Sequence, residues 1–218
     1  MKSALFVLPQ MSINHPTQTQ IDLLRHGEPV GGRRYRGQRD DPLSEKGWQQ
    51  MRAAVAGRQD WDVIYSSPLS RCAEFAQELS ARLSLPVKTD ERLKEIGFGV
   101  WEGRTPDEIR RDDPQRLENF WRDPVANRPE GAETLASFQT RVSAAWTELC
   151  AAQCGQRVLL VGHAGITRMI LSLTLGSPVE HMFRIQVDNA GLTRIRIKGN
   201  DADALPTLIF HGRPPDAG

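Results

Sequence analysis

Two arginines and two histidines stand at or shortly after the ends of short apolar runs: Arg25, His26, Arg71 and His163. This combination is poorly suited to holding a metal ion, because a guanidinium has no lone pair to donate. It is well suited to a phosphoryl group, since planar guanidinium forks match phosphoryl oxygens and keep their charge at physiological pH. A histidine beside such a group can donate a hydrogen bond or attack phosphorus as a nucleophile. These residue types therefore indicate phosphoryl chemistry.

The apolar runs before these residues predict buried β-strands at 21–24, 62–65 and 157–161. Expected helices alternate with them, over 44–58, over 68–83 and after His163 to Leu175. Strands that alternate with helices predict an α/β fold with a largely parallel sheet. Ligands bind at the carboxyl ends of the strands in such sheets, so the arginines and histidines are expected to meet at that edge. Helix N-termini at the same edge would add backbone N–H donors for an anion.

Further elements are expected as a strand at 86–89, a helix starting at 105, a helix at 133–153 and a strand at 207–211. The helix at 133–153 carries apolar residues three or four positions apart, which is typical of a helix with one buried face. The segments 183–187 and 192–198 alternate in polarity around Asn189-Ala190-Gly191 and predict a β-hairpin.

A carboxyl group that could protonate a leaving group lies in the glycine- and aromatic-rich segment 93–103. Glu95 follows the strand expected at 86–89, so it can reach the same edge of the sheet. Burial beside Phe98 and Trp101 would favour the protonated form that a general acid needs. Without the other strand ends, a surface carboxylate would be the favoured interpretation of Glu95, and a lone histidine at a strand end is more often structural than catalytic. The joint occurrence at successive strand ends favours a catalytic site.

Arg25-His26-Gly27, Arg71 in Ser-Ser-Pro-Leu-Ser-Arg and His163 in Val-Gly-His-Ala-Gly, in this order, resemble the histidine phosphatase superfamily. The resemblance covers about residues 20–198. It implies a phosphoglycerate-mutase-like fold: a three-layer α/β/α sandwich with a mostly parallel central sheet. It also implies catalysis without a metal or another cofactor. By resemblance, His26 is the nucleophile that is phosphorylated and then hydrolysed.

The same resemblance assigns roles to the other residues. Arg25, Arg71 and His163 would hold the phosphoryl oxygens. Glu95 would protonate the departing alcohol and then activate water. The physical chemistry agrees with this division, since phosphoryl transfer needs in-line positioning and fixed cations around three equatorial oxygens. The attacking nitrogen of His26 must be unprotonated, so a carbonyl group is expected to hold its other nitrogen.

The segments Tyr-Arg-Gly-Gln at 35–38 and Arg-Pro-Glu-Gly-Ala-Glu-Thr at 128–134 resemble the α-ribazole-phosphate phosphatase branch, which acts in cobalamin synthesis. Gly37, Gln38 and Ala164 are the substrate contacts expected from this resemblance. The chain departs from the family pattern after Arg25-His26-Gly27, because no Asn follows and Gly32 stands near that position. Cys72 stands where Ala is usual. The missing Asn removes one phosphate contact but neither the nucleophile nor the arginines.

The loop 31–39 holds four arginines in nine residues. These arginines could steer an anionic substrate, with Tyr35 stacking on a ring of it. A solvated loop whose charges face water explains any one of the arginines equally well.

Length and composition exclude several classes of protein. The 218 residues carry a net charge of +1, which argues against a general attraction to nucleic acid or membranes. No apolar stretch approaches the ~20 residues of a membrane span. Three cysteines are an odd number and too few for a disulfide framework, which favours a reducing, cytoplasmic location. A single catalytic domain is expected at 20–212, after a loosely ordered leader at 1–19 and before a tail at 213–218.

The favoured function is a metal-independent phosphomonoesterase that acts on a small molecule, with α-ribazole 5′-phosphate as the expected substrate. A broad-specificity phosphatase and a phosphoglycerate-mutase-like enzyme are the alternatives within the enzymes. A noncatalytic module that binds a phosphorylated ligand is the alternative outside them, and the presence of both His26 and Glu95 argues against it. The pattern does not indicate an oligomeric state.

Overall fold

The computed structural model describes residues 18–199 and 204–213. Most of the expected leader and tail therefore lies outside the described residues. Strand β1 begins at Gln18, so the domain boundary expected at 19/20 falls inside this strand. Arg213, expected in the tail, is the last residue of β6.

Within the described residues, six strands form one sheet in the order β3-β2-β4-β1-β5-β6. Their bounds are β1 Gln18–Arg25, β2 Val63–Ser66, β3 Val87–Thr89, β4 Arg157–Gly162, β5 Leu192–Lys198 and β6 Leu205–Arg213. The four strands β3, β2, β4 and β1 are parallel, and β5 and β6 add an antiparallel edge. The prediction of a mostly parallel sheet is confirmed.

The helices are α1 Glu45–Ala54, α2 Ser70–Leu83, α3 Pro106–Asp112, α4 Arg116–Arg122, α5 Leu135–Ala152 and α6 Ala164–Leu175. Residue types that favour helix ends stand at the bounds of α1, α3 and α6. Ser44 caps α1 by accepting from the Gly47 N–H, and Thr105 forms a capping box with Glu108 at α3. Gly176 ends α6 in the left-handed conformation that Gly adopts without strain.

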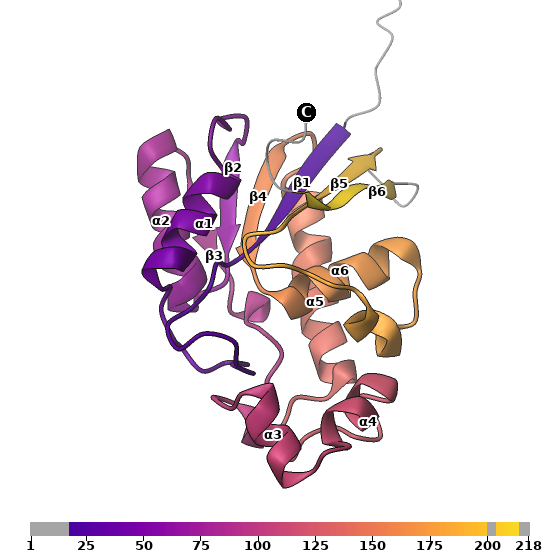
Figure 1. Cartoon of the computed structure of the whole chain (residues 1–218). Coiled ribbons are helices and arrows are strands. Elements are labelled where there is room, and N and C mark those ends of the chain that lie inside the picture. The colour runs from indigo at the N-terminus through magenta and orange to yellow at the C-terminus, as the bar shows by residue number, and fades with distance from the viewer. Residues whose placement is uncertain (1–17, 200–203, 214–218) are drawn as a thin grey trace, which may run out of the picture.

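Helices cover both faces of the sheet, which gives the three layers that the resemblance implied (Figure 1). Ile21 and Leu23 of β1 pack with α5 and α6, whereas Leu24 packs with α1 and α2. This alternation follows from the two-residue period of a strand. The helices α3 and α4 lie apart from these layers, beyond the edge at which β1 and β4 end (Figure 1).

The prediction of a β-hairpin around Asn189-Ala190-Gly191 is wrong. Residues Val179–Arg184 form a 3₁₀ turn, and β5 pairs instead with β1 and β6. Two arginine side chains donate hydrogen bonds to the backbone after this turn. Arg25 donates to the carbonyl of Val187, and Arg168 donates to the carbonyl of Ile185. This segment therefore forms a wall beside the sheet edge, not a strand.

Candidate active site

A cavity of about 720 Å³ opens at the carboxyl ends of the parallel strands, within the usual size range of small-molecule sites. Six of the predicted site residues line it: Arg25, His26, Gly37, Arg71, Glu95 and Ala164. His163 is fully buried directly behind this lining. The exposed Gln38 is not among the lining residues, and its backbone N–H donates to the carboxylate of Glu102.

His26 is held by backbone groups on both sides. Its own N–H donates to the carbonyl of Gly162 at the end of β4, at 2.9 Å. Its ring Nδ1 lies 2.7 Å from the carbonyl oxygen of Gly27. Because a carbonyl only accepts, Nδ1 carries the proton, and Nε2 keeps the lone pair that a nucleophile needs. A Cβ on Gly27 would lie 2.3 Å from the carbonyl oxygen of Gly47, so only Gly lets the chain pass α1 this closely.

His163 faces His26 edge-on, with 5.2 Å between the ring centroids. Its Nε2 lies 2.8 Å from the hydroxyl of Ser67, which follows β2. The Cys72 thiol lies 3.7 Å from the same nitrogen and fills the space behind the ring. The junctions after β1, β2 and β4 therefore meet as the sequence predicted.

Both imidazoles are kept neutral by their surroundings. Burial lowers the pKa of His26 well below 6.5, and the nearby cations Arg25 and Arg71 lower it further. Burial also lowers the pKa of His163 well below 6.5, with Arg71 again adding to the effect. Two neutral rings can thus lie in contact with two cationic side chains.

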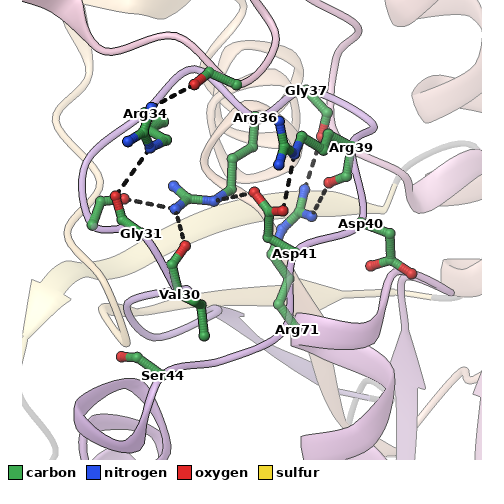
Figure 2. A network of polar contacts seen from close by, with 12 residues as sticks. Val30, Gly31, Arg34, Arg36, Gly37, Arg39, Asp40, Asp41, Ser44 and Arg71 are labelled. Carbon is green, nitrogen blue, oxygen red and sulfur yellow. Dashed lines mark hydrogen bonds and ion pairs between the residues drawn. The ribbon is translucent and has the colours of Figure 1, made fainter.

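The two arginines are positioned by backbone carbonyls. Arg25 Nη1 donates to Val187 at 2.6 Å. Arg71 donates through Nη1 to Arg39 at 2.7 Å and through Nη2 to Gly37 at 2.8 Å (Figure 2). The Nε of Arg25 and the Nε of Arg71 are buried and have no hydrogen-bond partner among the described residues. Burial lowers the pKa of Arg25 to about 10, so it remains a cation at neutral pH. A buried donor without an acceptor costs stability, so holding these two cations beside the cavity is unfavourable for the fold itself.

Glu95 is fixed against the first turn of α6. Its Oε1 accepts from the backbone N–H of Ile96 and of Gly165, each at 3.0 Å. A Cβ on Gly165 would lie 2.2 Å from this oxygen, so the contact depends on Gly at that position. Phe98 lines the cavity near Glu95, whereas Trp101 is packed in the core behind it.

Three residues of the cavity wall, Arg168, Phe183 and Trp121, were not predicted from the sequence. Arg168 lines it from α6, donates through Nε to the carbonyl of Ile185, and lies 5.7 Å from the ring centroid of Phe183. The position of Arg168, four residues after Ala164 and therefore on the same helix face, is the signal that could have found it. Phe183 and Trp121 come from segments outside the sheet, and nothing in their spacing points to a site.

Within residues 18–199 and 204–213, no three His, Cys, Asp or Glu side chains gather as metal ligands would. In the same part of the chain, no helix combines the length and the apolarity that crossing a membrane requires.

Comparison with known proteins agrees with this geometry. The model of the histidine phosphatase superfamily (branch 1) matches residues 21–205. The chain therefore belongs to the histidine phosphatase superfamily, and the expectation drawn from the sequence motifs is confirmed.

Among curated relatives, bifunctional protein Rv2228c of Mycobacterium tuberculosis is 34% identical over 194 residues, which are 87% of this chain. The chain spans only about half of that relative, 53% of its length. Phosphoserine phosphatase 1 of Hydrogenobacter thermophilus is 32% identical over 185 residues, covering 82% of this chain and 87% of the relative.

Two solved structures show the same fold. Mycobacterial glucosyl-3-phosphoglycerate phosphatase has a TM-score of 0.78 at 29% identity, over 88% of this chain and 98% of the other. The α-ribazole phosphatase from Shigella flexneri has a TM-score of 0.76 at 26% identity, over 89% and 96%. Both structures therefore agree with the family match in showing the fold of the histidine phosphatase superfamily.

The two buried histidines predict a loss of stability in mild acid. Their pKa values lie below 6.5 in the folded chain, so the unfolded chain binds more protons as the pH falls below 6.5. The free energy of unfolding should therefore decrease from pH 7.5 to 5.5, by at most about 1.4 kcal/mol per pH unit for each histidine. Urea unfolding at several pH values would measure this. The substitution His163→Gln should make the decrease less steep, and an unchanged slope would contradict the assignment.

Proposed function

We propose that the chain hydrolyses phosphomonoesters through a phosphohistidine formed at His26. The observation that carries the proposal is that Arg25 and Arg71 line one cavity together with His26, a neutral imidazole whose Nε2 keeps its lone pair. Two such cations suit the equatorial oxygens of a transferring phosphoryl group.

In the first step, the lone pair of His26 Nε2 forms a bond to phosphorus, and the bond from phosphorus to the ester oxygen breaks. The departing oxygen takes a proton from Glu95, whose carboxyl group lines the same cavity. Arg25 and Arg71 balance the charge on the phosphoryl oxygens. His163, which is neutral and adjacent to the His26 ring, serves as a further hydrogen-bonding group.

In the second step, water attacks the phosphohistidine while Glu95 takes a proton from it. The bond from phosphorus to nitrogen breaks, inorganic phosphate leaves, and His26 regains its neutral form. Glu95 thus gives one proton and takes one back, and each turnover restores the starting state.

For the substrate we propose α-ribazole 5′-phosphate, which places the enzyme in cobalamin synthesis. The aromatic rings of Tyr35, Trp121 and Phe183 in the cavity lining support this, because they suit the flat ring of a nucleoside. The segments at 35–38 and 128–134 and the fold shared with an α-ribazole phosphatase support it further.

The nucleophile is tested by His26→Ala. This substitution should reduce turnover of p-nitrophenyl phosphate by at least about 10³-fold, because the bond to phosphorus can no longer form. It should also abolish acid-labile labelling of the protein by radioactive substrate. His181→Ala, which removes a histidine outside the cavity, is the matched control. Labelling that persists without His26 would refute the assignment.

The leaving-group proton is tested by Glu95→Gln. This substitution should slow an alkyl phosphate by about 10²-fold or more but p-nitrophenyl phosphate by much less, because p-nitrophenolate leaves without protonation. Gly165→Ala should show the same split, since its Cβ would displace the Glu95 carboxylate. Gly97→Ala is the control, because a Cβ there meets its neighbours at ordinary contact distances of 3.6 Å or more. Equal losses on both substrates would exclude Glu95 as the acid.

Substrate identity is tested with a panel of phosphomonoesters: α-ribazole 5′-phosphate, phosphoserine and 3-phosphoglycerate. The highest kcat/KM is expected for α-ribazole 5′-phosphate, with release of free phosphate. Isomerised 3-phosphoglycerate without free phosphate would indicate a mutase. Binding of all three without turnover would indicate a noncatalytic module.

A further inference from the structure

One arginine of the loop 31–39 differs from its neighbours. Arg33, Arg34 and Arg36 all line the cavity, but Arg33 and Arg34 are exposed, as is Arg39, whereas Arg36 is only 8% exposed. Figure 2 shows its guanidinium inside the loop, surrounded by oxygen atoms of the loop. Burial of a cation is costly without compensation, so these contacts must account for its position.

Three contacts fix the guanidinium of Arg36. Its Nε lies 3.1 Å from Oδ2 of Asp41, and its Nη2 donates to the carbonyls of Val30 and Gly32 at 2.7 Å each (Figure 2). These acceptors use Nε and Nη2 and leave Nη1. Nη1 makes no hydrogen bond with the described residues, and it is not among the solvent-excluded atoms that lack a partner. Because Arg36 itself lines the cavity, Nη1 is the donor that remains for a ligand there.

The same loop also holds the Arg71 guanidinium, through the carbonyls of Gly37 and Arg39. The loop therefore brings Arg36 and Arg71 to one side of the cavity. Burial lowers the pKa of Arg36, and the charge of Arg71 lowers it further, whereas Asp41 raises it. Burial is also the main cause of the lowered pKa of His26, to which the charge of Arg36 adds. Arg36 thus belongs electrostatically to the group that surrounds His26.

We propose that Arg36 is a third guanidinium ligand of the phosphoryl group, donating through Nη1, and that Asp41 is its positioning residue. This inference rests on the proposed phosphatase function. It also accounts for the absence of an Asn near Gly32: the Arg36 side chain is bound to the Gly32 carbonyl, so a cation occupies the region where a neutral amide was expected. The site then holds the phosphoryl oxygens with three fixed guanidinium groups, of which Arg36 is paired with the Asp41 carboxylate.

The test measures binding of inorganic phosphate by calorimetry, which does not depend on turnover. Arg36→Gln should raise the Kd of phosphate by at least about tenfold, the effect of losing a charge-assisted hydrogen bond. Arg36→Lys keeps the charge without the fork and should give a smaller rise. Asp41→Asn should raise the Kd less than Arg36→Gln, because it loosens the guanidinium without removing it.

Arg52→Gln is the charge-matched control, since Arg52 pairs with Glu78 on the exposed sides of α1 and α2. It should leave the Kd of phosphate within twofold. A Kd for Arg36→Gln equal to that of the control would overturn the proposal, as would an Asp41→Asn effect larger than that of Arg36→Gln. If Arg36→Gln does not fold, the same comparison is made with Arg36→Lys, whose unchanged Kd would also overturn it.

Failure of the proposed function gives a different result. In that case the wild-type chain would bind phosphate through Arg36 yet release none from any ester and form no phosphohistidine. Failure of the Arg36 assignment alone would leave turnover and labelling of His26 in place.

Discussion

Backbone carbonyls hold the positive charges of Arg25 and Arg71 without neutralising them. Arg25 donates to Val187, and Arg71 donates to Gly37 and Arg39. A carboxylate in these places would position each guanidinium equally well but would cancel the charge that an anionic ligand needs. Carbonyl dipoles fix the direction of the donors and leave the net charge available. Folding must therefore remove these cations from water with only partial compensation by the carbonyl groups, which costs stability.

Burial, together with these cations, explains the state of the imidazoles. A histidine placed among arginines and removed from water loses its proton readily, so His26 and His163 remain neutral bases. The carbonyl of Gly27 then selects the tautomer of His26. The unprotonated Nε2 of His26 therefore results from burial, neighbouring charge and one hydrogen bond, all of which depend on the packed sheet edge.

The sequence predicted the parts of the site that lie on regular elements. Strand ends marked by Arg25-His26 and Gly162-His163 could be found because apolar runs and helix signals bracket them. The hairpin expected around Asn189-Ala190-Gly191 failed because alternating polarity does not distinguish a strand from a segment whose carbonyls serve arginines. The burial of Arg36 could not be predicted either, since it depends on how the loop folds back on Asp41, Val30 and Gly32. Charges in a loop carry no periodicity that would separate an inward side chain from a solvated one.

One end of the cavity is formed by the packed edge of the sheet, and the other end is formed by short segments outside the sheet. His26 directly follows β1 and is anchored on one side by β4 and on the other by α1, where Gly27 meets Gly47. Trp121 and Phe183 stand on short segments outside the sheet, which can change length and sequence without disturbing strand pairing. The sequence around His26 is consequently constrained by strand and helix packing, whereas the segments that carry Trp121 and Phe183 can change during evolution. A descendant of this chain can acquire a new leaving-group preference and still inherit the same chemistry.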